Sequence, residues 1–327
     1  MIKVDPKRYL RIVEDPWYRG LVSVQDIISF ETAVFWKKRG VKCLHLPITT
    51  NAVSSPMGLG SDSEPVAIEL FGVRTYLADS MQFMLEYGCR LAKEGTYYLM
   101  PSFRGEPSDK VHLNQFFHSE AEIPGGLEDV VRVADEYVRH LATAVLREHS
   151  SLVEDLAGDT KHVEEFLASP SARITFDDAA EMLTGEEDVI VQHDGWRSIS
   201  RKGERLLIER LGPAVWLTNF DRLSTPFYQA ASPEGRGALC ADLLLGPGEI
   251  IGCGERHTTG DEVRDALHDH RVPPEDYRWY TELKDAAPMR TSGFGMGVER
   301  FIMWLLRSDD IRNLQLAERY NGVLTAP

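Results

Sequence analysis

The sequence predicts an α+β protein in which helices flank an antiparallel β-sheet. The strand-like segments follow one another in series rather than alternating with helices, which is the order expected of an antiparallel sheet. Two long segments carry apolar residues at the spacing of an α-helix. The chain of 327 residues is 43% hydrophobic and 27% charged, which is the composition of a globular protein with a substantial buried core.

The formal net charge is −15, because 36 Lys and Arg residues stand against 51 Asp and Glu residues. So acidic a surface does not favour non-specific binding along nucleic acid. No apolar run reaches the length of a membrane span, and the N-terminus lacks the apolar core of a secretory signal. The four cysteines contain no CxxC pair, which favours reduced thiols over disulfides or a zinc site. We therefore expect a cytoplasmic protein with no membrane partner.

The first third of the chain is predicted to form two helices and three strands. Helical spacing of apolar residues indicates the first helix, which ends at Gly40. A stretch rich in Ser, Gly and Pro indicates a mobile loop, and Gly72 is the expected turn of a hairpin. The predicted elements are a helix over 24–39, a strand over 41–46, the loop over 49–65, strands over 66–71 and 74–78, and a helix over 81–91.

The remainder supplies further strands and the second long helix. A more polar segment at about 150–210 is predicted to be a mostly helical insertion. No linker or repeat divides the chain, so we expect residues 1–327 to form a single domain. The predicted elements are strands over 97–104, 116–123, 214–220, 238–245 and 248–253, and helices over 127–149 and 298–306.

A glycine-rich segment, SGFGMGVERF at 292–301, lacks the GxGxxG spacing of a dinucleotide-binding loop. Its glycines, Gly295 and Gly297 among them, would let a ligand approach the backbone closely. Arg300 opens the helix that follows, where it could hold a phosphate. A tight strand-to-helix turn with a surface arginine explains the segment equally well.

Charged residues alternate along two of the predicted strands. Arg104 and Glu106 share one face, either as a plain salt bridge or as part of a site. A second strand face carries one aromatic residue, one histidine and two carboxylates, which fits a polar cavity or a solvated surface better than an apolar core. These four residues are Phe116, His118, Glu120 and Glu122.

Asp242 and Glu249 flank a turn that contains Gly246-Pro247-Gly248. Two carboxylates at such a turn could share Mg²⁺ with substrate phosphates, or they could be unpaired surface acids. The sequence contains no HExxH, GxSxG or GxxxxGK[ST] motif, so we expect neither a histidine metal site nor a hydrolase or P-loop site.

Taken together, these segments resemble the three motifs of the class II aminoacyl-tRNA synthetase catalytic core, in its aspartyl/asparaginyl branch. The resemblance covers about 22–320, and the helix over 24–39 resembles motif 1, which forms the dimer interface in that family. It implies ATP and Mg²⁺ as cofactors and a homodimer. The segments that carry it are YLADSMQF, PSFRGE, FFHSEAEI, GEIIGCGER, DYRWYTELK and SGFGMGVERFIMWLL.

The resemblance also implies roles for individual residues. Arg104 and Arg300 would be the catalytic groups that hold the α- and γ-phosphates, because activation of a carboxylate needs positioning and neutralised charge. The implied ATP-binding residues are Arg104, Glu106, Phe116, Glu249, Gly295, Gly297 and Arg300. The implied Mg²⁺ ligands are Asp242 and Glu249, and the implied amino-acid-binding residues are Ser80, Gln82, Leu85, Glu120 and Arg256.

A departure from the family pattern points to the amino acid. Aspartate-handling members carry a lysine where this chain has Leu85, which leaves Arg256 as one positive charge in the pocket. One charge suits the neutral amide of asparagine better than a second carboxylate. The region over 49–79, in contrast, resembles the short archaeal asparagine synthetases derived from the same family.

Only about twenty residues precede the motif 1 segment, too few for the OB-fold anticodon-binding domain of the translation enzymes, so we expect none. The first hypothesis is a stand-alone amide ligase. It would adenylate an aspartate- or asparagine-like amino acid, release pyrophosphate, and transfer the acyl group to ammonia, another amine or a carrier. The alternative is charging of tRNA by a minimal asparaginyl-type synthetase, which the acidic charge disfavours. The second alternative is a non-catalytic regulatory or binding paralogue.

Overall fold

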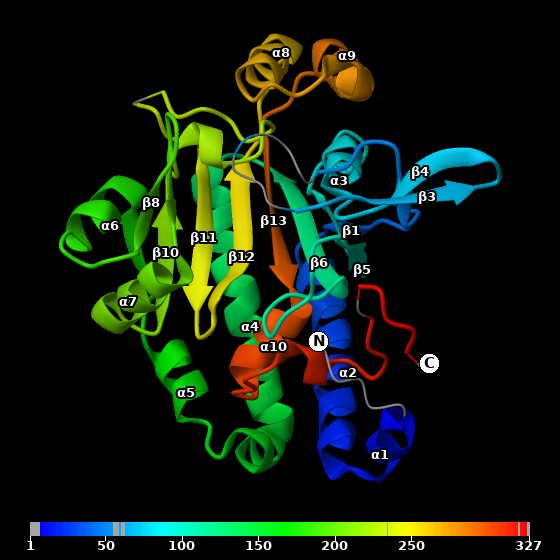
Figure 1. The fold of residues 1–327 in the computed structure, drawn as a ribbon, viewed down its shortest axis with the longest axis vertical. Coiled ribbons are helices and arrows are strands. Elements are labelled where there is room, and N and C mark those ends of the chain that lie inside the picture. The colour runs from blue at the N-terminus through cyan, green and yellow to red at the C-terminus, as the bar shows by residue number, and fades with distance from the viewer. Residues whose placement is uncertain (1–6, 55–58, 60–62, 234, 320, 326–327) are drawn as a thin grey trace.

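The computed structural model describes residues 7–54, 59, 63–233, 235–319 and 321–325. Eight strands form a central sheet (Figure 1). In order across the sheet they are β1 (Lys42–Cys43), β5 (Thr96–Phe103), β6 (Gln115–Pro124), β13 (Thr291–Gly297), β12 (Gly248–Glu255), β11 (Cys240–Leu245), β10 (Ala214–Thr218) and β7 (Ala172–Thr175). The inner strands pair antiparallel, and only the edge strands β1 and β7 pair parallel with their described neighbours.

Helices cover this sheet, so the predicted α+β class is confirmed. The long helices α2 (Pro16–Lys38) and α4 (Leu127–Ala157) pack against each other behind the sheet in the view of Figure 1. The helix α10 (Val298–Leu305) joins them in covering the largest apolar cluster. That cluster includes the buried rings of Trp36, Tyr137 and Phe301. The side of the sheet that faces α2 and α4 therefore carries the main core, while a smaller apolar cluster buries other sheet residues, among them Val215, Leu217 and Leu244.

Both long helices extend beyond their predicted bounds. The helix α2 begins at Pro16 rather than at residue 24, because Asp15 accepts a hydrogen bond from the Trp17 amide at 2.9 Å and caps the first turn. Proline is tolerated there, since a first-turn amide has no partner inside the helix. The helix α4 continues past residue 149 to Ala157, with a kink at His149.

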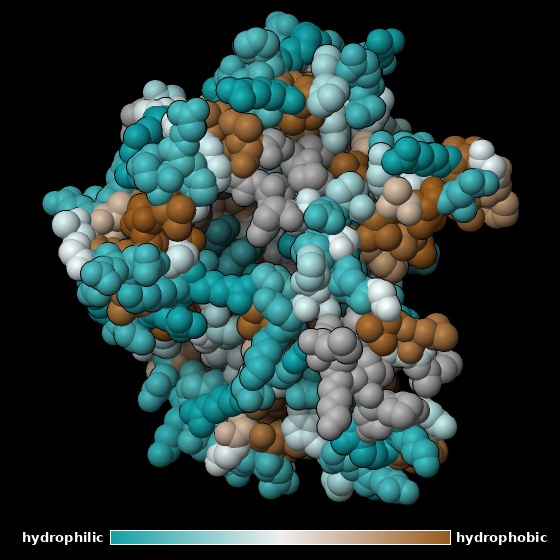
Figure 2. Space-filling model, viewed as in Figure 1, coloured by the Kyte–Doolittle hydropathy of each residue, from teal (hydrophilic) through white to brown (hydrophobic). Residues whose placement is uncertain are grey.

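The N-terminal part adds α1 (Arg8–Glu14) and a three-stranded sheet of β2 (Thr49–Thr50), β4 (Val73–Leu77) and β3 (Val66–Leu70). The predicted hairpin is present and turns at Phe71 and Gly72. Figure 2 shows brown apolar atoms on this projecting hairpin, where Phe71 is 95% exposed. The predicted loop begins with β2, and its residues 55–58 and 60–62 lie outside the described residues.

The segment over 150–210 contains strands as well as the predicted helices. Its strand β7 joins the edge of the central sheet beside β10, and a hairpin precedes the last helix. The elements after α4 are α5 (Lys161–Ala168), α6 (Phe176–Met182), β8 (Ile190–Gln192), β9 (Arg197–Ile199) and α7 (Arg201–Leu211). This segment is therefore built onto the sheet.

Three further helices lie at the upper end of the sheet in Figure 1. They are α3 (Gln82–Cys89), α8 (Gly260–Asp269) and α9 (Arg278–Ala286). Aromatic side chains from these helices and the neighbouring segment form a second buried cluster, which includes Phe83, Phe227 and Tyr280. This packing fixes α9 beside α3, one wall of the site described next. Within the described residues, no helix is long and apolar enough to cross a membrane.

Candidate active site

Alternating glycines form the floor of the site. In β13, Gly295 and Gly297 flank Met296, whose side chain is buried in the core. Because successive strand residues point to opposite faces, the two glycines lie on the face turned away from α2 and α4. Gly252 of β12 pairs with Gly295, so the floor continues across two strands. A ligand can therefore lie directly on the backbone there.

One row across the strands carries charged groups at this floor. The residues that lie opposite one another in register are Asp242, Gly252, Gly295, Glu120 and Tyr98. A Cβ atom at Gly295 would lie 2.9 Å from Oε1 of Glu120, which is closer than Cβ atoms approach their neighbours. Glycine at this position therefore makes room for the Glu120 carboxylate.

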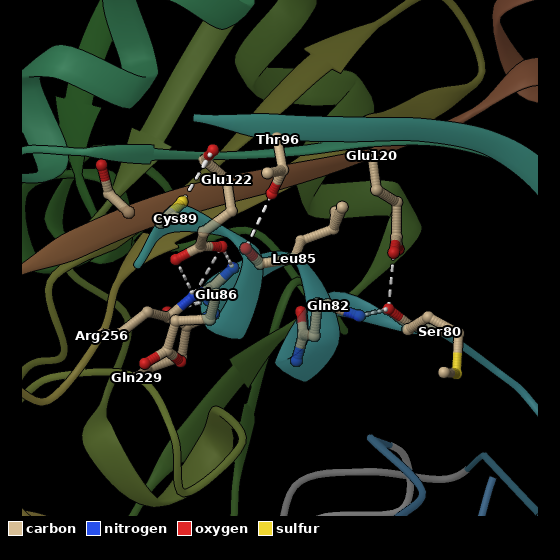
Figure 3. A network of polar contacts seen from close by, with 12 residues as sticks. Ser80, Gln82, Leu85, Glu86, Cys89, Thr96, Glu120, Glu122, Gln229 and Arg256 are labelled. Atoms are coloured by element: carbon tan, nitrogen blue, oxygen red, sulfur yellow. Dashed lines mark hydrogen bonds and ion pairs between the residues drawn. The ribbon is translucent and has the colours of Figure 1, made fainter. Parts of the chain in front are cut away.

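Glu120 lines a cavity of about 360 Å³. Ser80 donates a hydrogen bond to Oε2 of Glu120 at 2.6 Å (Figure 3), and the Tyr98 hydroxyl donates to the same oxygen. Burial raises the pKa of the Glu120 carboxyl to about 8. The side chain of Gln82 also lines this cavity, and its Nε2 is buried with no hydrogen-bond partner among the described residues. This part of the cavity thus offers an acceptor for an ammonium group and an unused donor.

Arg256 lines another wall of the same cavity and forms a buried ion pair with Glu122 (Figure 3). Nη2 of Arg256 lies 3.0 Å from Oε2 of Glu122, and Nε lies 3.2 Å from both carboxylate oxygens. Nη1 donates to Oε1 of Gln229 at 3.2 Å, and the guanidinium carbon lies 5.5 Å from the centre of the Tyr228 ring. The charge of Arg256 is therefore balanced inside the protein.

A second cavity, of about 100 Å³, adjoins the first. The guanidinium carbon of Arg104 lies 5.5 Å from the centre of the Phe116 ring, and the shortest distance from Arg104 to the Glu106 carboxylate is 4.0 Å. Nε of Arg104 is buried with no hydrogen-bond partner in the described part of the chain. Burial and the nearby arginines lower the pKa of His118 to about 3, so this shared lining residue is neutral. An unpaired cationic donor beside an aromatic ring suits a nucleotide.

Arg300 faces the second cavity from the first turn of α10. Its Nη1 donates to the backbone oxygen of Glu249 at 2.9 Å and lies 3.5 Å from Oε2 of the same residue. Both residues also line a third cavity, of about 200 Å³, together with His112, Arg201 and Glu204. Cationic and anionic side chains therefore meet where the cavities join.

Asp242 and Glu249 converge over Gly252. From the position of a Cβ atom at Gly252, Oε1 of Glu249 would be 3.1 Å away and Oδ1 of Asp242 3.5 Å away. Burial, with the charges of Glu249 and Glu204, raises the pKa of Asp242 well above its usual value. Burial and the charge of Glu249 raise the pKa of Glu204 to about 7.

These carboxylates supply the hard oxygen ligands that Mg²⁺ prefers. Within the described residues, no group of three or more His, Cys, Asp or Glu side chains is arranged to hold a metal ion by itself. Mg²⁺ normally keeps several water ligands and shares one or two carboxylates with substrate phosphates. Asp242 and Glu249 therefore fit the ion as part of a complex with phosphate.

The structure brings the sequence-predicted site residues together, with one exception. Leu85 is 1% exposed and packs in an apolar cluster with Met81 and Tyr98, and it is not among the described residues that line the cavities. The roles of all these residues remain predictions. The first cavity is lined by Ser80, Gln82, Arg104, Glu120, Asp242, Glu249, Gly295 and Arg256, and the second by Arg104, Glu106, Phe116, Glu249, Gly295, Gly297 and Arg300.

The profile of the family described as tRNA synthetases class II (D, K and N) matches residues 6–317. The chain belongs to this family. Two curated class II relatives are both named asparagine–tRNA ligase. The one from Koribacter versatilis is 27% identical over 288 residues, which cover 85% of this chain and 63% of the relative. The one from Thermococcus gammatolerans is 30% identical over 250 residues, which cover 75% of this chain and 57% of the relative. The chain thus spans less than two thirds of either relative.

Solved class II structures match nearly the whole chain. The asparaginyl-tRNA synthetase of Pyrococcus horikoshii, complexed with asparaginyl-adenylate, has a TM-score of 0.89 and 26% identity, and the match covers 98% of this chain and 73% of that one. The asparaginyl-tRNA synthetase of Entamoeba histolytica, also with asparaginyl-adenylate, has a TM-score of 0.85 and 25% identity, covering 99% and 74%. These matches confirm the predicted synthetase-like core.

Several residues of this class II site were given no role by the sequence. Alternation along β6 places Glu122 on the cavity face, but nothing in its segment indicates a partner. Glu204 lies on a polar helix far from Asp242 in the chain, and Gln229 stands in a segment without a recognisable pattern. The sequence contains one indication of where Glu122 lies, the glycine at position 293. In the structure, a Cβ atom at Gly293 would lie 1.8 Å from Oε2 of Glu122.

Proposed function

We propose that the chain activates an amino acid with ATP, forming an aminoacyl-adenylate and releasing pyrophosphate. The observation that carries this proposal is the adjoining pair of cavities, one lined by Arg104, Phe116 and Arg300 and the other by Ser80 and Glu120. A carboxylate oxygen of the amino acid would attack the α-phosphorus while the bond from that phosphorus to the pyrophosphate oxygen breaks. Arg104 and Arg300 would neutralise the charge that builds on the phosphate oxygens.

Asp242 and Glu249 are the residues that would hold Mg²⁺. Bound there, the ion would neutralise charge on the substrate phosphates. Glu120 would hold the α-ammonium group of the amino acid, because its carboxyl group lines the cavity and a bound positive charge favours its ionised form. The side-chain Nε2 of Gln82 would donate a hydrogen bond to an acceptor on the substrate, which would satisfy this buried donor.

We infer that the amino acid is asparagine. Arg256 can donate to a side-chain carbonyl oxygen, while Glu122 cancels its charge and removes the attraction for a second carboxylate. A neutral amide is therefore favoured over aspartate. The names of the relatives support the same choice, as do the two related structures complexed with asparaginyl-adenylate.

For the acceptor, the sequence ranked ammonia, another amine or a carrier above tRNA. The relatives named above support the opposite order, because each is an asparagine–tRNA ligase or an asparaginyl-tRNA synthetase. We therefore propose transfer of the asparaginyl group to tRNA. The stand-alone amide ligase, in which an amine takes the acyl group, is the alternative outcome of the test below.

Exchange of labelled pyrophosphate into ATP, measured with asparagine, aspartate and glutamine, tests activation. We expect exchange with asparagine that requires Mg²⁺ and falls about 100-fold or more in Arg300→Ala. No exchange with any of these amino acids would refute activation and leave the non-catalytic paralogue. Retention of labelled asparagine on tRNA, compared with formation of an asparagine amide from an added amine, then decides the acceptor.

The homodimer implied by the motif 1 resemblance also stays a proposal. The helix α2 buries one side against α4 and exposes Phe30, which is 66% accessible in the single chain. A large exposed aromatic side chain on this helix supports its pairing with a second copy. Sedimentation equilibrium tests the dimer, and a monomer at micromolar concentration would refute it.

A further inference from the structure

Lys284 of α9 is a fully buried lysine. Its ammonium group forms an ion pair with Oε1 of Glu86 and donates a hydrogen bond to the backbone oxygen of His257. A buried ammonium group is stable only when it is paired and hydrogen-bonded. These two contacts satisfy both conditions. They also connect α9 to α3 and to the segment that follows β12.

Glu86, the partner of Lys284, is itself 1% exposed and belongs to α3. Tyr280, one turn before Lys284 on α9, donates its hydroxyl hydrogen to Oε2 of Glu86 at 2.6 Å. Nη1 of Arg90 lies 3.7 Å from Oε1 of Glu86, and it donates a hydrogen bond to the backbone oxygen of the same residue. Lys284 is therefore the main charge that balances Glu86.

Two routes lead from Lys284 to Arg256. The first is the chain itself: Lys284 holds the carbonyl group of His257, the residue directly after Arg256. The second is electrostatic. Burial raises the pKa of Glu122, Arg256 lowers it, and the nearby charge of Glu86 raises it again. Figure 3 shows Glu86 close to the Arg256–Glu122 pair.

We propose that Lys284 is a positioning residue for recognition of the amino-acid side chain, holding Arg256 on Glu122 by neutralising Glu86. This inference rests on the proposed activation of asparagine and adds a residue to its specificity. Without the lysine charge, two buried carboxylates, Glu86 and Glu122, would compete for Arg256. The guanidinium group would then leave the place where it meets the substrate.

Lys284→Met tests this role, because methionine keeps an unbranched apolar side chain and removes the charge. In pyrophosphate exchange we expect the KM for asparagine to rise about tenfold or more, while the KM for ATP stays within about twofold. The double variant Glu86→Gln/Lys284→Met removes both charges. We expect it to bring the asparagine KM back to within about threefold of the unmodified chain, because the competing carboxylate is gone.

The matched control is Arg264→Met. Arg264 of α8 pairs with Asp285, the residue next to Lys284, in an exposed ion pair at 2.9 Å. This substitution removes the cation that pairs with an exposed α9 carboxylate and is expected to leave both KM values unchanged. Thermal unfolding followed by circular dichroism reports whether each variant folds.

Parallel increases of both KM values in Lys284→Met, or failure of the double variant to restore asparagine binding, would show a merely structural lysine and overturn the inference. An unchanged asparagine KM in Lys284→Met would overturn it as well. If the single variant does not fold, the asparagine KM of the double variant decides. Absence of exchange by the unmodified chain is a different result, since it refutes the proposed activation itself.

Discussion

Glu122 and Arg256 form an ion pair whose side chains are 1% and 4% exposed, with Nη2 and Oε2 3.0 Å apart. The pair spans β6 and the end of β12, and Gly293 lies between them without a side chain. A buried guanidinium group with a carboxylate partner carries no net charge to attract a second carboxylate. This relationship is the physical argument for the proposed preference for asparagine over aspartate.

Glu122→Gln is the direct test of that choice. The variant leaves Arg256 with an uncompensated charge, so aspartate gains an attraction that asparagine does not. We expect the ratio of kcat/KM for aspartate to that for asparagine to rise about tenfold or more. Glu69→Gln, on the exposed hairpin strand β3, is the control and should leave the ratio unchanged. An unaltered ratio in Glu122→Gln would contradict the charge-balance argument.

Leu85→Lys tests the sequence difference that first indicated asparagine, namely a leucine where aspartate-handling members of the family carry a lysine. The lysine stem would lie in the apolar cluster with Met81 and Tyr98. We expect a lower Tm, since an ammonium group enters a buried place, together with a shift of preference toward aspartate. Leu85→Met, which conserves volume, should change neither quantity. A destabilised variant with unchanged preference would contradict the specificity role of this position.

The pH dependence of stability reports on Glu120. Burial raises its pKa from 4.5 to about 8, so between about pH 5 and pH 8 the folded chain keeps a proton that the unfolded chain has released. The contribution of Glu120 therefore lowers the free energy of unfolding as pH rises, by up to about 1.4 kcal/mol per pH unit. Glu120→Gln should flatten this slope in chemical denaturation at pH 5.5 and 7.5. Equal slopes in the two proteins would contradict the raised pKa.

Local patterns predicted much of the fold and the floor of the site. The glycines of GFGMG were expected to let a ligand approach the backbone, and in the structure they alternate with the buried Phe294 and Met296 and leave one face of β13 without side chains. The start of α2 was predicted too late, although Asp15 and Pro16 are the expected cap and first-turn residues. Apolar periodicity becomes evident only further along that helix.

Pairs of distant residues could not be predicted in the same way. Glu86 and Lys284 lie on two different helices. From the sequence, each would be predicted to be an ordinary exposed charge on a helix. Only the packing of α9 beside α3 brings them into one buried contact. Candidate roles for single residues could therefore be proposed from the sequence, while the partners that tune their charge depend on tertiary structure.

Glu204 provides the last test, because two opposite effects are expected from one substitution. Glu204→Gln removes one of three carboxylates that repel one another, the others being Asp242 and Glu249, so the chain without Mg²⁺ and ATP should become more stable at pH 8. The same change removes negative charge near the ion, so the increase of Tm caused by Mg²⁺ with ATP should shrink. Half-saturation by Mg²⁺ in pyrophosphate exchange should rise roughly tenfold, as for other residues that support metal ligands. Glu209→Gln, exposed on the same helix, is the control and should change none of these. Loss of stability without Mg²⁺ in Glu204→Gln would instead identify Glu204 as a structural group that holds the turn before Glu249.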